Sequence, residues 1–167
     1  MDWQIPLLVS AVVFAAFLVF RMRPAVTPRA RERAAALAVA TKRIEASKDD
    51  ATRAVALADA ADACAALGRT NRAVGYYLRA LRSDPRSARI VERTAAGLAR
   101  RPGALERLMW RHLAAHAWEG EGREAALAGL RTLERIYSKR PRHRMRAQAI
   151  AHALAALAGA ADAPPSA

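Results

Sequence analysis

The side chains best suited to chemistry are two histidines that lie four residues apart, His112 and His116. On a helix this spacing puts both imidazoles on one face, where a zinc ion would also need the nearby carboxylates of Glu119 and Glu121. The sequence lacks the H-E-x-x-H pattern of a helical zinc site, and the further ligands would come from a glycine-containing loop. We therefore interpret both histidines as surface or interhelical side chains, and we expect no metal site and no cofactor.

Other catalytic patterns are also missing from the sequence. The eight glycines are scattered singly and form no phosphate-binding loop, and there is no G-x-S-x-G turn. Cys64 is the only cysteine, so an internal disulfide is impossible, and its position on an apolar helix face indicates a buried thiol. We expect that the chain is not an enzyme.

An apolar stretch without a charged residue, WQIPLLVSAVVFAAFLVF, occupies residues 3–20. About twenty helical residues, at about 1.5 Å each, span the ~30 Å hydrocarbon layer of a bilayer. A cleaved signal peptide would instead have basic residues before the stretch and a small-x-small cleavage site after it, and both are absent. We therefore predict that residues 1–22 are a retained transmembrane anchor.

Basic residues follow this stretch immediately, whereas only Met1 and Asp2 precede Trp3. The positive-inside rule then predicts a single-pass membrane protein with its N-terminus outside and its C-terminal domain in the cytoplasm. The same side chains are candidates for contact with anionic lipid headgroups. These arginines are Arg21, Arg23, Arg29, Arg31 and Arg33.

The composition predicts an all-α fold. Ala and Arg, both strong helix formers, dominate the sequence, and aromatic residues make up only 5% of it. The net charge of +13 is compatible with anionic lipid, an acidic protein partner or nucleic acid, and the excess of Arg over Lys is also compatible with a GC-rich coding bias. We expect four parts, namely a transmembrane anchor at 1–22, a basic juxtamembrane linker and helix at 23–50, a helical domain at 51–160 and a disordered tail at 161–167.

The clearest pattern in the helical domain is a helical hairpin. We predict a first helix over residues 51–67 with Asp50 or Thr52 as its cap, a turn at Gly68, and a second helix that Thr70 or Asn71 caps and Pro85 follows. This segment, about a fifth of the chain, resembles one tetratricopeptide repeat, a helical hairpin of about 34 residues, and together with the predicted anchor it suggests a membrane-anchored bacterial protein of the tetratricopeptide-like type. The resemblance gives the hairpin core as Leu57, Cys64, Gly68, Ala73, Tyr77, Ala80 and Pro85, with Ala60 and Ala61 where the family favours Leu-Gly.

Further helices are predicted over residues 29–47, 86–100, 104–118, 122–141 and 142–158. We interpret 122–141 as the second helix of a later repeat, and the soluble part as about three hairpins with a cap. The resemblance implies a concave groove that binds an extended or helical segment of a partner, although the same residues could instead pack against the next hairpin. Its lining would be Val55, Ala58, Asp62, Ala65 and Ala66.

Two functions follow from these features. The first is a scaffold or adaptor that presents a repeat-like domain for protein–protein interaction at the cytoplasmic membrane face. The second is a structural accessory subunit of a larger membrane complex, which packs through its span at the small residues Ala11, Ala15 and Ala16. A weaker third possibility is direct binding of anionic lipid or nucleic acid through the basic residues of 139–146, but the absence of interleaved aromatics argues against nucleic acid.

Overall fold

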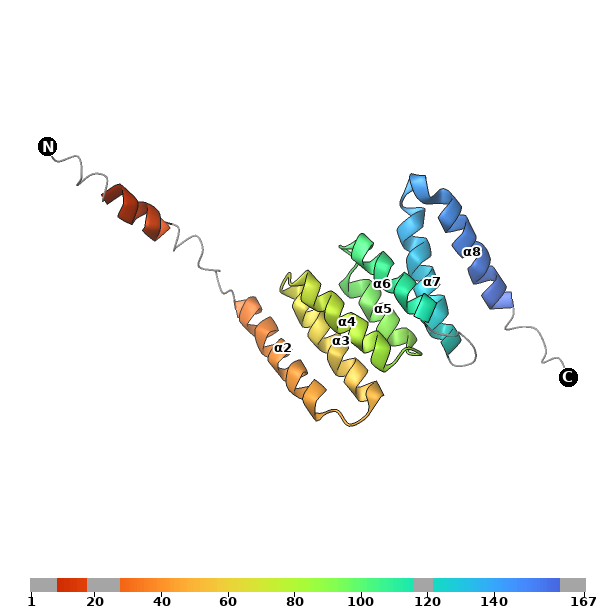
Figure 1. Ribbon diagram of the computed structural model, residues 1–167, viewed down its shortest axis with the longest axis horizontal. Helices are drawn as coiled ribbons and strands as arrows, with labels where there is room; N and C mark the ends of the chain where they lie inside the picture. The colour runs from red at the N-terminus through yellow and green to blue at the C-terminus, as the bar shows by residue number, and fades with distance from the viewer. Residues whose placement is uncertain (1–8, 18–27, 116–121, 160–167) are drawn as a thin grey trace. The chain divides into compact units, whose positions relative to one another are not determined.

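The computed structural model of this 167-residue chain describes residues 9–17, 28–115 and 122–159 (Figure 1). These residues are helical apart from short turns, and no strand occurs among them, which confirms the all-α prediction. The chain divides into two units, Met1–Glu32 and Arg33–Ala167. The division falls after Glu32, so most of the helix assigned to the juxtamembrane region belongs to the second unit.

In the first unit, residues 9–17 are helical and lie in the middle of the predicted anchor. Their large apolar side chains are more than half exposed, for example Val13 and Phe14 at 62% each. Within the described ranges, no helix is both long and apolar enough to cross a membrane. The other residues of 1–22 and the tail at 161–167 lie outside the described residues, so both assignments stay predictions.

The helices from residue 28 onward follow the predicted ranges to within a few residues, except that residues 116–121 lie outside the described part. They are α2 (Pro28–Ala46), α3 (Asp50–Ala66), α4 (Thr70–Ser83), α5 (Ala88–Gly97), α6 (Pro102–Ala115), α7 (Arg123–Ser138), a 3-10 turn (Pro141–His143) and α8 (Arg144–Gly159).

The predicted hairpin is formed by α3 and α4, and its turn satisfies the end of α3. Gly68 has a φ of +74°, a left-handed conformation that glycine adopts without strain. The amide of Gly68 donates to the Ala65 carbonyl at 3.0 Å, and that of Arg69 donates to the Cys64 carbonyl at 2.9 Å. This pair of bonds is a Schellman motif, which uses carbonyls that the helix itself leaves without partners.

The helix caps differ from the prediction by one residue or more. The cap of α3 is Asp49, whose carboxylate accepts the Thr52 amide at 2.7 Å, rather than Asp50 or Thr52. The N-cap of α4 is Arg69, which makes no side-chain cap bond, and Thr70 is already the first helical residue. The short turn causes this shift, because the chain enters α4 directly from the Schellman motif.

The structure places the apolar residues of the expected hairpin core at the centre of the helical domain. Leu57, Cys64, Ala73, Tyr77 and Ala80 are each at most 1% exposed. Gly68 is exposed at the turn, and Pro85 is partly exposed after the end of α4.

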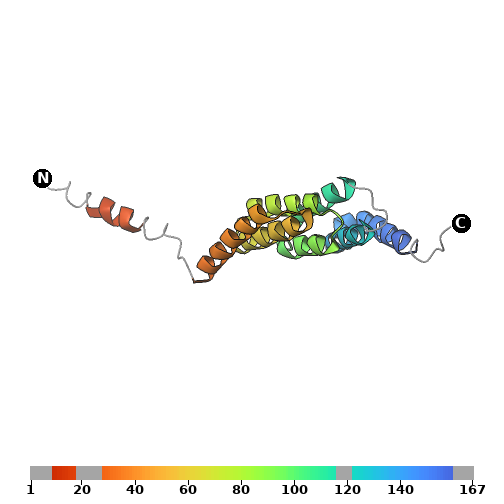
Figure 2. The same cartoon turned by 90° about the horizontal axis from the view of Figure 1, so that it is seen from below.

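The helices stack in two layers. Helices α3, α5 and α7 pack side by side in sequence order, and α4 and α6 pack on each other and cover them. Figure 2 shows α4 and α6 above α5 and α7, and α8 packs against α7. The consecutive helices α5 and α6, which the structure describes throughout, make little contact with each other, because each packs on α7 instead.

The position of α7 corrects the expected register of repeats. It lies beside α5, in the layer of first helices, rather than in the covering layer. Gly129 permits this close packing, since an added Cβ would lie 3.2 Å from Leu113 of α6. Most of α7 is buried, including Ala125, Leu133 and Tyr137, as expected for a helix with neighbours on several sides.

Helices α2 and α8 bury fewer of their apolar residues than their sequences suggest. In α2, Ala40 is buried and Leu37 and Ile44 pack against the core, whereas Val39 is 51% exposed. In α8, Ile150 is buried, but Met145 is 78% exposed. Each helix has a neighbour on one side only, so apolar residues outside that stripe face solvent.

Candidate functional site

The structure describes only one member of the candidate histidine pair. His112 lies in α6 at 4% exposure, while His116, Glu119 and Glu121 lie outside the described residues. No group of three possible metal ligands occurs in the described part of the chain. Cys64 is fully buried, and burial raises the pKa of its thiol, which disfavours a reactive thiolate.

The five residues of the expected partner groove do not form one open surface. Ala58 is fully buried, and the carbonyl of Ala66 accepts a 2.7 Å hydrogen bond from Arg33 of α2. Val55 lines a hollow between α2 and α3, whereas Ala65 lines a separate one beside the α5–α6 turn. Packing on both sides of α3 separates these residues, so they do not line a single open groove in the described structure, and their role in partner binding stays a prediction.

Asp62, the fifth residue of that groove, belongs to a polar network that joins three helices. The Tyr77 hydroxyl of α4 donates to Asp62 of α3, and Arg93 of α5 binds both Asp62 and Asp59, the latter at 2.8 Å. Gly97 of α5 lies directly against the Tyr77 hydroxyl. This network fixes the position of α5 on the α3–α4 hairpin.

The network also shifts the pKa values of Tyr77 and Arg93. Burial and the hydrogen bond to Asp62 raise the pKa of Tyr77 far above its ordinary value. Burial opposes the charge of Arg93, but its hydrogen bonds to Asp62 and Asp59 outweigh this effect and its pKa is raised. The two aspartates therefore have a common ion-pair partner, Arg93, inside the protein.

A second network, which the sequence did not reveal, joins α6, α7 and the start of α8. The Tyr137 hydroxyl donates to Glu106 at 2.8 Å and accepts a hydrogen bond from the Trp110 indole at 2.8 Å. Arg140 binds the same carboxylate at 3.2 Å, and Arg146 approaches it at 3.8 Å. Two arginines of the basic patch at 139–146 are therefore engaged in ion pairs with Glu106, which reduces the charge available for a nucleic acid.

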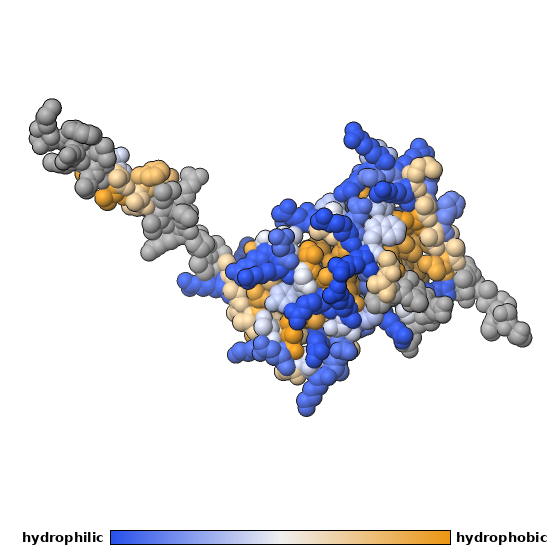
Figure 3. Space-filling view, in the orientation of Figure 1, coloured by the Kyte–Doolittle hydropathy of each residue, from blue (hydrophilic) through white to orange (hydrophobic). Residues whose placement is uncertain are grey.

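An apolar groove remains open between the covering helices α4 and α6. It has a volume of about 350 Å³. Val74 and Leu78, half-buried on α4, and Leu108, 4% exposed on α6, form its floor. Its complete lining is Thr70, Asn71, Val74, Leu78, Ala104, Arg107, Leu108 and Arg111. We call this the α4–α6 groove, and Figure 3 shows apolar surface between hydrophilic side chains on this side of the domain.

Charge is distributed unevenly between the two layers. Helices α4 and α6 carry five arginines and one carboxylate, Glu106, which already binds Tyr137 and Arg140. Helices α3, α5 and α7 together carry six arginines and six carboxylates. The α4–α6 groove therefore opens on the more positive side of the domain.

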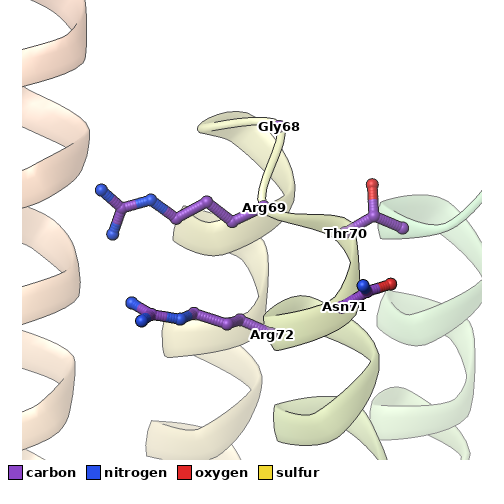
Figure 4. A pocket seen from close by; sticks show the side chains of 5 residues that line it. All are labelled: Gly68, Arg69, Thr70, Asn71 and Arg72. Atoms are coloured by element: carbon purple, nitrogen blue, oxygen red, sulfur yellow. The ribbon is translucent and has the colours of Figure 1, made fainter.

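The start of α4 extends this positive charge beyond the groove. Figure 4 shows Arg69 and Arg72 projecting to one side of the helix, and Thr70 and Asn71 projecting to the other. Thr70 and Asn71 form one end of the α4–α6 groove. A second hollow, which shares Thr70 and Asn71 with the groove, is lined by these residues together with Gly68, Arg69 and Arg72 and contains no apolar side chain.

The arginines expected at lipid headgroups are only partly described. Arg29 and Arg31 are exposed in the first turns of α2, whereas Arg21 and Arg23 lie outside the described residues. Arg33 is exposed but holds α2 to the end of α3 through the Ala66 carbonyl. Its role in the described structure is thus to position α2.

Comparisons of this chain with protein-family models, curated proteins and solved structures give no match.

Proposed function

We propose that this chain is a membrane-anchored scaffold that binds other proteins through a short, repeat-like array of helices. The observation that carries the proposal is the α4–α6 groove, an apolar surface with an arginine rim on a stacked helical domain. Helical arrays of this kind typically offer an extended surface to a partner, since their stacking buries one face of each hairpin and leaves another open. The described residues offer no comparable set of catalytic groups.

The resemblance to tetratricopeptide repeats supports this proposal. The α3–α4 hairpin has a turn glycine, a buried aromatic residue in its second helix and a proline after that helix. The stacking of α3, α5 and α7 beneath α4 and α6 supports a layered helical array, in which, among the described helices, only α3 and α4 form a regular hairpin of consecutive helices before α7. We therefore infer a short tetratricopeptide-like array with irregular later units.

The anchor is the second part of the proposal. The charge-free residues 3–20 are followed by arginines, and the described part, 9–17, is helical with exposed apolar side chains. We propose that this segment spans the membrane and that the helical domain lies on the cytoplasmic side. Anionic headgroups there would contact the arginines that follow the span, Arg21, Arg23, Arg29 and Arg31. Arg33 would contribute less, because its guanidinium group also binds the carbonyl of Ala66.

An affinity-tagged full-length chain, expressed in its native cells, tests this function. After in-cell cross-linking, the membranes are dissolved in mild detergent and proteins bound to the tag are identified by mass spectrometry. We expect a defined set of partners in a fixed ratio to the chain, and we expect fewer of them when residues 1–22 are deleted. Recovery of the chain alone from cross-linked membranes, or only in the soluble fraction, contradicts the proposal.

The alternative function is a structural accessory subunit held by its span. The observation that favours it is the position of Ala11 and Ala15, which lie one turn apart in the helical residues 9–17 and permit close contact between helices. Replacing residues 3–20 by an unrelated apolar span separates the two functions. A scaffold that binds through its helical domain keeps its partners after this exchange. An accessory subunit that binds through its span loses them.

A further inference from the structure

We propose that the α4–α6 groove binds an acidic amphipathic helix of a partner protein. This inference rests on the proposed scaffold function and assigns its binding surface and the chemistry of its partner. Three observations support it: the apolar floor, the spacing of the residues on both sides, and the unbalanced charge of the rim.

The floor of the groove suits the apolar face of a helix. Val74 and Leu78 are four residues apart on α4, and Leu108 faces the same hollow from α6. Residues four apart on a helix are neighbours on one face. A partner helix with apolar residues at the same interval can therefore place successive side chains along the groove, as in other helix-in-groove complexes.

The rim determines the charge of the partner. Arg107 and Arg111 are exposed and are also four residues apart, along the α6 side of the groove. In the part of the chain that the structure describes, neither arginine forms an ion pair. Aspartate or glutamate residues at a spacing of four, beside the apolar face of the partner, would meet both guanidinium groups.

The shape of the groove favours a peptide over a lipid surface. Its apolar floor is recessed, because Leu108 is 4% exposed and Val74 and Leu78 are half-buried, while the exposed arginines stand beside them. A bilayer surface would first meet the arginines, whereas side chains of a helix can enter the hollow. Stacking of nucleic acid bases is not supported, since the groove lining contains no aromatic residue.

Selection from a random peptide library tests the proposal without knowledge of the natural partner. The full-length chain in zwitterionic detergent micelles is the bait, and the affinity of selected peptides is measured by fluorescence anisotropy. We expect peptides with apolar residues three or four apart and several Asp or Glu residues. A neutral or basic consensus, or no selected peptide, overturns the proposal.

Two charge-reversed variants locate the binding surface. In the first, R107E and R111E reverse the rim, and we expect binding of the acidic peptides to weaken about tenfold or more. In the control, R79E and R82E reverse the same number of exposed arginines on α4 outside the groove lining, and we expect less than about a threefold change, caused by general electrostatics. Circular dichroism first establishes that both variants are folded.

A complementary peptide completes the test. Replacing the acidic residues of a selected peptide by lysine should abolish its binding to the natural chain and restore binding to the variant with R107E and R111E. The proposal is contradicted if both charge-reversed variants weaken peptide binding equally. It is also contradicted if anionic vesicles bind in a way that depends on Arg107 and Arg111 while the peptides do not bind. The same variant is also tested in the cross-linking experiment on native membranes. If it still recovers the partners of the natural chain, the scaffold function stands and only the groove is excluded as the binding surface.

Discussion

Gly97 of α5 and Tyr77 of α4 are in such close contact that a Cβ atom on Gly97 would lie 1.8 Å from the tyrosine hydroxyl oxygen. The Tyr77 ring is fully buried, and its hydroxyl is held by Asp62, so it has no free space into which to move. Glycine at position 97 is thus a packing requirement of the polar network that joins α3, α4 and α5.

Gly97→Ala should therefore destabilise the helical domain. We expect the free energy of unfolding to fall by about 1–3 kcal/mol, the usual cost of overfilling a packed core. The measurement is urea denaturation followed by circular dichroism. Gly75→Ala is the matched control, because an added Cβ there meets no atom within 4 Å and alanine is the better helix former by up to about 1 kcal/mol. Equal effects of the two substitutions would disprove the contact.

Alkaline pH should destabilise the chain through Tyr77. The pKa of this tyrosine is raised in the folded state, so its contribution to stability is complete below the unfolded value of 10.0 and is lost as the pH rises above it. One extra proton retained on folding gives a slope of at most about 1.4 kcal/mol per pH unit. Denaturation between pH 9 and 11.5 should show a smaller slope for Tyr77→Phe than for the natural chain. Parallel slopes would contradict the predicted ionisation behaviour.

The cap of α3 should make stability sensitive to acid. Hydrogen bonds from Thr52 lower the pKa of Asp49, so its contribution is present above the unfolded value of 3.8 and disappears as the pH falls further. Asp49→Ala should lower the Tm at pH 7, because the first turn of α3 loses its cap. Asp49→Asn, which retains a capping oxygen without the charge, should lower the Tm less and flatten its dependence on pH between 2 and 5. Thermal melts across this range decide the outcome.

Glu106 should stabilise the C-terminal end of the domain rather than its first hairpin. Its carboxylate accepts the Tyr137 hydroxyl and binds Arg140, so Glu106→Ala leaves two polar groups without their partner. We expect a loss of about 1–3 kcal/mol. Hydrogen exchange should become faster in α7 and α8 and stay unchanged in α3 and α4. Uniformly faster exchange along the chain would show that the effect is not local.

The α3–α4 hairpin could be predicted from the sequence because its signals are local. Gly68 marks the turn, Pro85 marks the end, and the apolar residues between them repeat at helical spacing. The error in the cap of α3 arose because Asp49, Asp50 and Thr52 are all suitable capping residues, and only the backbone geometry selects Asp49.

The packing of α7 and the site of the open groove could not be predicted in the same way. Alanine-rich helices have small apolar side chains on several faces, so their sequences do not reveal which face meets which neighbour. Position 58 illustrates this, since Ala58 matched a groove position of the family but lies fully buried in the core. Likewise, the α4–α6 groove depends on two helices that lie 19 or more residues apart and meet only in the folded chain.

The small contact between α5 and α6 has a consequence for how the domain folds. These two helices form no self-sufficient hairpin, and α7, which follows both of them in the chain, supplies the surface on which they meet. A ribosome must therefore have released α7 before either helix gains its full set of neighbours. Unlike a modular array that grows one hairpin at a time, this domain should complete its folding in a single late step, and it should not tolerate being shortened from the C-terminal side.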